Sequence, residues 1–297
     1  MTLTRTAEVV AAGYTLLEGP RWHDGALWVS DFFSHRVLKF LPSHGGVEVA
    51  TVCVVEGQPS GLGFMPDGEL RISSMLDRRL LSWDGDKLQV VADLSGFVSG
   101  PANDLAIDSE GRAFVGNFGL NPARSREALP TSLLRVDPSG VVSVAAEDVV
   151  FPNGIVIDEG AGLLYAAETY RSRITVWDYA QGDLSNRRSW VEFSADPGAY
   201  DIPDTTVSLN VLPDGIAQDS ERQMWVADAK GHGVRRVAAD GTTTEFVETG
   251  LSTYAVALGG DDGRDLYICC APPAESFDPS REARSVLMRC RVDVAAA

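Results

Sequence analysis

Six segments of the chain begin an apolar strand pattern with a residue that could bind a ligand. These residues recur at intervals of 42, 43, 50, 61 and 40 positions, and they are Glu18, Ser60, Asn103, Asn153, Asp214 and Tyr254. Four of the six carry a carboxylate or a carboxamide, whose oxygens are the preferred donors for hard cations. A fold that brings the repeats together would therefore create a cation site with oxygen ligands.

A second series of residues ends the apolar segment that follows each of these positions. Its members are Asp31, Ser74, Asn117, Glu168, Asp228 and Cys270. An antiparallel strand returns beside the start of the previous strand, so both series are expected at the same end of the repeats. The carboxylates of the two series would repel one another unless a cation is bound or some are protonated.

We predict that one divalent cation resolves this repulsion, with Glu18, Asn153 and Asp214 as its direct ligands. Oxygen donors favour calcium, magnesium or manganese, and a site with few protein ligands plus water also suits zinc. Calcium is the first expectation. Asn103 would then face a bound water or the substrate.

The repeats that carry these residues predict the fold. Each contains a short apolar segment, a turn rich in Gly and Asp, and further apolar segments, with no convincing amphipathic helix between them. Six four-stranded antiparallel units at this spacing indicate an all-β, six-bladed β-propeller, a single domain over residues 1–297. The last unit lacks one strand, and a strand over residues 4–12 is expected to close it. A β-sandwich, the alternative, gives no reason for six copies of one pattern.

The net charge of the chain argues against some kinds of binding partner. The 297 residues include 25 Lys plus Arg and 42 Asp plus Glu, a formal net charge of −17. This negative field disfavours nucleic acid and anionic membranes. With neither a signal-peptide pattern nor an apolar run long enough to span a bilayer, we expect a cytoplasmic protein, a monomer or a small homo-oligomer.

Four motifs resemble the regucalcin/gluconolactonase (SGL) family of six-bladed propellers, and the resemblance covers nearly the whole chain. They are EGPRW from Glu18, AND at 102–104, PNGI at 152–155 and PDGI at 213–216. The resemblance implies that Glu18, Asn153 and Asp214 are metal ligands and that Asn103 contacts substrate. Two positions depart from the sugar-lactone members, which carry an Arg at Pro101 and tend to carry an acidic residue at Asn121. A less polar lactone is therefore as plausible a substrate as a sugar lactone.

Three long connections are expected at the metal-bearing end, over residues 118–131, 185–212 and 271–285. Connections of this length often have a functional role. Their apolar residues could form a wall for the substrate or could simply be buried in surface loops; they are Phe118, Leu120, Tyr200, Ile202 and Phe277.

The leading hypothesis is metal-dependent hydrolysis of a cyclic ester, a carboxylic ester hydrolase reaction. The metal would polarise the carbonyl, and a carboxylate would accept the proton of the attacking water. The sequence leaves the catalytic base open among Asp214, Asp228 and Glu168, with Asp31 as a further carboxylate of the second series that could serve. The expected substrate contacts are Asn103, Asn117, Asn121, Asp31 and Phe118.

Two alternatives remain at this point. The first is a propeller like strictosidine synthase, in which the same fold supports condensation or cyclisation without a catalytic metal. The second is a non-enzymatic module that binds calcium or a protein partner. Fold alone separates neither from a lactonase, because function depends on the site.

Overall fold

Short apolar segments form the strands, and turns of Asp and Gly reverse the chain between them. His23 pairs with Ala26 across a two-residue turn of Asp24 and Gly25, which have φ angles of 48° and 70°. A type I′ hairpin turn needs positive φ at both central residues, and Asp and Gly adopt it at low cost. The turns of the sequence repeat are thus hairpin turns in the structure.

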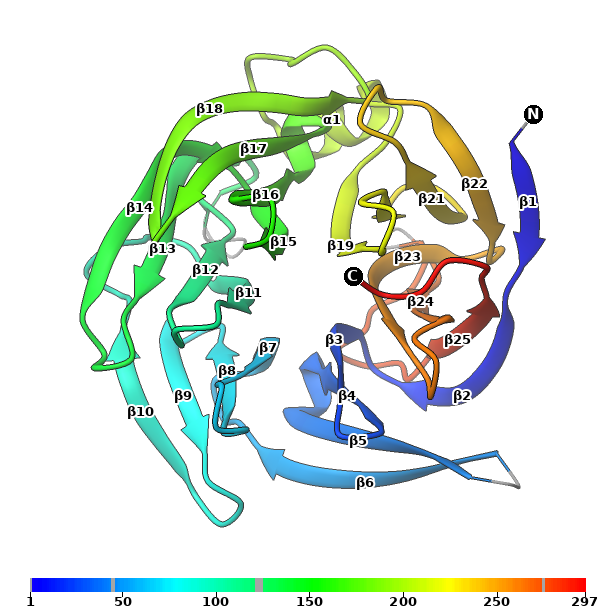
Figure 1. The fold of residues 1–297 in the computed structure, drawn as a ribbon, viewed down its shortest axis with the longest axis horizontal. Coiled ribbons are helices and arrows are strands. Elements are labelled where there is room, and N and C mark those ends of the chain that lie inside the picture. Colours follow the sequence, from blue (N-terminus) through cyan, green and yellow to red (C-terminus); the bar gives the residue numbers. More distant parts are fainter. Residues whose placement is uncertain (1, 44–45, 121–124, 274–275) are drawn as a thin grey trace. The chain divides into compact units, whose positions relative to one another are not determined.

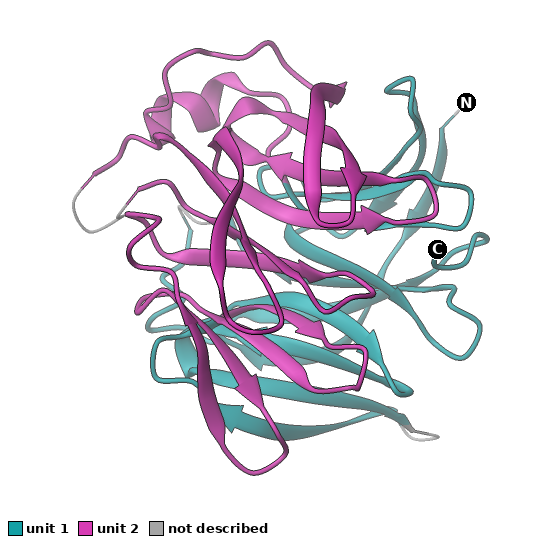
Figure 2. Ribbon diagram, turned by 60° about the vertical axis from the view of Figure 1, so that its left-hand side comes forward, with its two compact units in different colours: residues 1–59, 214–297 teal, residues 60–213 magenta. Residues whose placement is uncertain are grey.

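A computed structural model describes residues 2–43, 46–120, 125–273 and 276–297. Its contacts divide the chain into two compact units, residues 1–59 with 214–297 and residues 60–213 (Figure 2). Each unit contains three sheets with the antiparallel strand order of propeller blades (Figure 1). The prediction of a six-bladed β-propeller with four-stranded blades is confirmed.

In the unit of residues 60–213, the strands of each blade pair in chain order. The first blade contains β7 (Pro59–Phe64), β8 (Leu70–Ser74), β9 (Arg79–Trp83) and β10 (Leu88–Asp93). The second contains β11 (Ala102–Ile107), β12 (Ala113–Asn117), β13 (Pro130–Val136) and β14 (Val142–Val150). The third contains β15 (Pro152–Asp158), β16 (Leu163–Glu168), the 3₁₀ turn η2 (Thr169–Arg171), β17 (Arg173–Ala180) and β18 (Asp183–Glu192).

The other unit also has three blades. One contains β3 (Leu17–His23), β4 (Ala26–Asp31), the 3₁₀ turn η1 (Phe32–Ser34), β5 (Arg36–Ser43) and β6 (Gly46–Val54). Another contains β19 (Pro213–Gln218), β20 (Met224–Asp228), β21 (Gly233–Val237) and β22 (Thr243–Glu248). The last contains β23 (Ser252–Gly259), β24 (Asp265–Ala271), β25 (Ser285–Arg291) and β2 (Glu8–Tyr14).

The N-terminal segment closes the last blade, as predicted, but it forms two strands instead of one. β2 pairs antiparallel with β25, whereas β1 (Leu3–Thr6) pairs parallel with β22 and adds a fifth strand to that sheet. The two strands separate at Ala7, which is buried and donates its N–H to the carbonyl of Glu248 at 3.0 Å. The segment therefore joins two blades of one unit.

One of the long connections contains a short helix. β18 continues to Glu192, and the connection that follows it contains the short helix α1 (Ile202–Ser208). The side chain of Asp201 caps this helix by accepting the N–H of Asp204 at 3.5 Å, and Pro203 occupies its first turn. An Asp cap followed by Pro is a recognised start signal, although the helix is too short to show an apolar period.

Glycines let the first strands of neighbouring blades approach closely. A Cβ atom added at Gly61 in β7 would lie 2.7 Å from the Cα of Asp104 in β11, inside the backbone of the next blade. In the other unit, a Cβ added at Gly215 in β19 would lie 2.6 Å from the Cα of Ala255 in β23. The glycine that follows the polar residue in these repeats is thus required by packing.

We expect Gly61→Ala to destabilise the protein by about 1–3 kcal/mol, because the new methyl group meets backbone that cannot rotate away. Gly96→Ala is the matched control, since a Cβ there meets nothing within 4 Å. Urea unfolding of both variants measures the difference. Equal stability of the two variants would contradict the packing role of Gly61.

Candidate active site

The first series of predicted residues occupies one equivalent position in its blades. Glu18, Asn103, Asn153 and Asp214 are the second residues of β3, β11, β15 and β19. Glu18 is half-buried, whereas the other three are only 5–6% exposed. Buried polar groups at one repeated position of an otherwise apolar strand point to a shared role.

Five members of the second series are the last residue of the adjacent strand, and the sixth, Cys270, is the second-last residue of β24. In three blades, the residue just before a member of the first series pairs with a member of the second: Leu17 with Asp31, Ala102 with Asn117, and Pro152 with Glu168. The predicted register, with both series at the same end of each blade, is confirmed.

Hydrogen bonds orient two of the predicted amides in the unit of residues 60–213. Asn103 Nδ2 donates to the carbonyl of Pro152 at 3.3 Å, and its Oδ1 accepts the hydroxyl of Ser60 at 3.4 Å. Asn153 Nδ2 donates to Oγ1 of Thr169 at 3.4 Å. This network presents Oδ1 of Asn153 as the end of the amide that can accept a cation or a substrate proton.

Hydrogen bonds and an ion pair from residues of its own unit hold the carboxylate of Asp31. Its Oδ1 accepts the N–H groups of Thr15 and Leu16 at 2.9 and 3.2 Å and also the Thr15 hydroxyl. Its Oδ2 accepts the Ser34 hydroxyl at 2.6 Å and lies 3.3 Å from Nη2 of Arg36. With no exposed surface, this carboxylate is built to anchor the chain before β3.

Asn117 has a similar arrangement. Its Nδ2 donates to the carbonyl of Ser132 at 2.7 Å, and its Oδ1 accepts the N–H of Gly119 and the hydroxyl of Thr131 at 3.0 and 2.8 Å. These bonds shape the turn after β12 and favour a structural role. The other expected contact in this connection, Asn121, lies outside the described residues.

Glu168 is fully buried and surrounded by cations. Oε2 accepts the N–H of Val150 at 2.8 Å and Nη1 of Arg171 at 3.0 Å. Oε1 lies 2.7 Å from Nη2 of Arg173 and 3.2 Å from Nη2 of Arg187. Burial alone would raise the pKa of Glu168, but the charge of Arg173 and hydrogen bonds from Thr175 and Val150 outweigh it and lower the pKa. An ion held this firmly is a poor proton acceptor.

Asp228, another candidate base, lies in the same blade as Asp214. Asp228 ends β20, which pairs with β19, so both carboxylates lie at the same end of this blade. Oδ1 of Asp228 accepts the N–H of Lys230 at 3.2 Å, and Oδ2 lies 3.8 Å from Nη2 of Arg235. This guanidinium is farther from the carboxylate than those around Glu168.

Several apolar residues of the long connections pack together in the unit of residues 60–213. Leu120 and Tyr200 are buried in a cluster with Ala128 and Val150, and Phe118 and Ile202 are half-buried against it. Phe277, the remaining residue of the predicted apolar wall, belongs to the other unit and is 8% exposed.

Two aromatic residues of the same cluster were absent from the predicted wall. Phe151 and Tyr170 are half-buried and pack against this cluster beside Phe118. Each lies two residues from a member of the polar series, Phe151 before Asn153 and Tyr170 after Glu168. That adjacency is a sequence signal that could have identified both.

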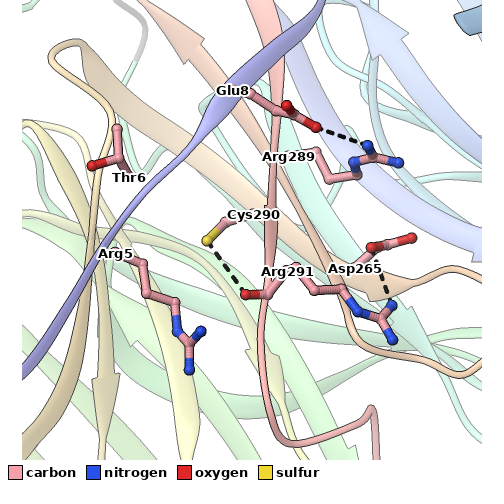
Figure 3. A pocket seen from close by; sticks show the side chains of 7 residues that line it. All are labelled: Arg5, Thr6, Glu8, Asp265, Arg289, Cys290 and Arg291. Atoms are coloured by element: carbon pink, nitrogen blue, oxygen red, sulfur yellow. Dashed lines mark hydrogen bonds and ion pairs between the residues drawn. The ribbon is translucent and has the colours of Figure 1, made fainter.

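A groove in the other unit offers an alternative location for ligand binding (Figure 3). It has a volume of about 440 Å³ and includes Arg5, Arg289 and Arg291. Each of these arginines is paired with a carboxylate: Arg5 with Glu245 and Asp293, Arg289 with Glu8, and Arg291 with Asp262 and Asp265. Because carboxylates already neutralise the three guanidinium groups, the groove is lined by ion pairs between strands and is a weaker candidate for ligand binding.

Over the described ranges, no three side chains of His, Cys, Asp or Glu gather as a metal site. The predicted ligand set differs from that pattern because it has two carboxylates and one amide. Within the same part of the chain, none of the helices is long and apolar enough to cross a membrane.

Comparisons with known proteins identify the family. The model of the SMP-30/Gluconolactonase/LRE-like region matches residues 16–272. A pentonolactonase of Haloferax volcanii is 30% identical over 315 residues, which cover 100% of this chain and 96% of that protein. A 6-deoxy-6-sulfogluconolactonase of Pseudomonas putida is 26% identical and covers 88% of this chain and 84% of its own.

A solved structure supports the fold. The calcium-binding protein regucalcin of Agrobacterium tumefaciens superposes with a TM-score of 0.80 at 18% identity, over 100% of this chain and 98% of that one. The family match spans most of the chain and contains every predicted metal ligand. The chain belongs to the SMP-30/gluconolactonase/LRE-like family.

Proposed function

We propose that this protein is a metal-dependent lactonase, which hydrolyses a cyclic ester to a hydroxy acid. One observation carries the proposal: a carboxylate or carboxamide side chain recurs at the second residue of the first strand of four blades, in a family whose relatives include lactonases. The pentonolactonase relative is similar over the whole chain. The name of this relative indicates lactone hydrolysis as the reaction class, and the oxygen-bearing side chains of this chain form the proposed metal site.

The proposed ligands are Glu18, Asn153 and Asp214. They are all hard oxygen donors, which fit calcium first and magnesium, manganese or zinc with added waters. The orientation of the Asn153 amide supports the assignment, because Nδ2 is engaged by Thr169 and the oxygen is presented. The neighbouring Cys269 is buried, and burial together with the charge of Glu18 raises the pKa of its thiol.

When bound, the cation would supply polarisation of the lactone carbonyl and acidification of the attacking water. Within this scheme, Asn103 orients the substrate through its amide, which Ser60 and Pro152 hold in place. Asp228 accepts the water proton at a carboxylate oxygen and returns it to the ring oxygen as the acyl C–O bond breaks. Glu168, Asp31 and Asn117 act by holding the backbone in position.

The test is acid release from a panel of lactones, followed with a pH indicator. Protein stripped with a chelator is compared with protein restored with calcium, magnesium, manganese or zinc. We expect hydrolysis only after restoration, with calcium the most effective ion. Hydrolysis that survives chelation would contradict the metal role. Failure to hydrolyse any lactone would overturn the proposal and favour a cyclising enzyme or a binding protein.

A further inference from the structure

Three aromatic rings form a continuous surface in the unit of residues 60–213, and we call Phe118, Phe151 and Tyr170 the aromatic shelf. Phe118 stacks on Phe151 with ring centroids 4.6 Å apart and an interplanar angle of 22°. Phe151 meets Tyr170 edge to face, with centroids 5.0 Å apart and an angle of 78°. All three side chains are half-buried, so each keeps some ring surface accessible.

The shelf adjoins the two candidate amides of this unit. The N–H of Phe118 donates to the carbonyl of Pro101 at 3.0 Å, two residues before Asn103. Phe151 directly precedes Pro152, whose carbonyl accepts Nδ2 of Asn103 at 3.3 Å. The rings are therefore attached to the same strand starts that present the polar groups.

The backbone of Phe151 is unusual for an aromatic residue. Its φ of 50° lies in the left-handed region, which bulky side chains avoid at a cost of about 1–3 kcal/mol. The N–H of Thr169 donates to its carbonyl at 3.4 Å and helps hold this conformation. Strain of this kind is concentrated at functional sites, where the structure needs a side chain in one direction.

A rigid base supports the shelf. Leu120, Ala128, Val150 and Tyr200 are buried beneath it. Nε of Arg171 donates to the Tyr200 hydroxyl at 2.9 Å, and its Nη1 donates to the carbonyl of Asp148 at 2.6 Å. This guanidinium therefore ties the connection that carries Tyr200 to the segment that leads into Phe151. The rings are fixed before any ligand arrives, which reduces the entropic cost of binding.

We propose that the aromatic shelf binds a hydrocarbon substituent on the lactone ring and selects alkyl- or aryl-substituted lactones over polyhydroxylated ones. This inference rests on the proposed lactonase function. The shelf offers ring faces and edges, which gain free energy by covering CH₂ groups or another ring. A polyhydroxylated substituent would instead lose hydrogen bonds to water on this surface without replacement.

The test compares kcat/KM for γ-butyrolactone, γ-hexalactone and γ-nonalactone, with gluconolactone as the polyhydroxylated probe. In the unaltered protein, each of the first added methylene groups should raise kcat/KM by about fourfold. Phe118→Ala and Phe151→Gly should remove most of this rise, measured as the ratio of kcat/KM for γ-nonalactone to kcat/KM for γ-butyrolactone in the same protein. A smaller fraction of folded enzyme cancels in this ratio, and Phe151→Gly also relieves the positive φ.

Phe64→Ala is the matched control, because Phe64 is a half-buried aromatic residue at the end of β7 opposite Ser60. It should keep the full alkyl preference. A preference for gluconolactone, or an alkyl preference unchanged in Phe118→Ala and Phe151→Gly, would overturn the shelf while the lactonase function stands.

If no lactone is hydrolysed, the proposed lactonase function is overturned, but the role of the aromatic shelf can still be tested by measuring ligand binding. Saturation-transfer NMR with γ-nonalactone should show contact of its alkyl protons with the unaltered protein and with Phe64→Ala. The contact should be lost in Phe151→Gly. Equal contact in all three proteins, or none in the unaltered protein, would overturn the shelf.

Discussion

Asp214→Asn is expected to abolish both cation binding and lactone hydrolysis, whereas Asp228→Asn should abolish hydrolysis and keep cation binding. The first substitution removes a proposed ligand, and the second removes the proposed proton acceptor. Loss of the cation, which supplies several kcal/mol of transition-state stabilisation, should lower kcat/KM by about a thousandfold or more. Loss of the base should lower kcat by about a hundredfold to ten-thousandfold.

The two effects are separated by calorimetric titration with calcium and by kcat at saturating calcium. Asp261→Asn is the control, because Asp261 is an exposed carboxylate in the same unit. It should change neither quantity. If Asp228→Asn retains its kcat, Asp228 is not the base. Undiminished calcium binding in Asp214→Asn would remove it from the ligand set.

Glu168→Gln is expected to cost about 3–5 kcal/mol of folding free energy. The substitution keeps the shape of the side chain but removes the negative charge that three guanidinium groups share. Leaving buried cations without their partner is among the most destabilising single changes. Urea unfolding measures the loss. Asp178→Asn is the control, because it breaks an exposed ion pair with Arg188 and should cost under about 1 kcal/mol.

The same carboxylate makes stability depend on pH. The pKa of Glu168 is lowered in the folded protein from its ordinary value of 4.5. Its contribution is therefore complete above that value and is lost as the pH falls through the lower folded-state pKa. We expect Glu168→Gln to flatten the acid limb of the stability profile. An unchanged acid limb would show that other carboxylates dominate it.

Much of the architecture follows from local sequence patterns. Asp24 and Gly25 predict a hairpin because few other residues tolerate positive φ at both positions. The spacing from Glu18 to Asp214 predicts blades because each repeat contains a complete antiparallel meander. The register between Pro152 and Glu168 follows from the same regularity, since one strand must return beside the other.

The division of roles among the polar residues depends on side-chain contacts that the repeat pattern does not show. Asp31, Glu168 and Asp228 look alike in the repeat, but three arginines gather around Glu168 and Thr15 and Ser34 engage Asp31. The same is true of Phe151 and Phe118, which stack across 33 residues of chain.

The sequence by itself therefore determined the blades, their closure by an N-terminal strand and the positions of the oxygen donors. These properties depend on turn chemistry and strand periodicity, which act between near neighbours. Only the tertiary structure decided which carboxylates are neutralised by arginine, where β1 pairs and which rings form a surface. Those outcomes depend on burial and on charge pairing in the folded chain, which turn chemistry and strand periodicity do not specify.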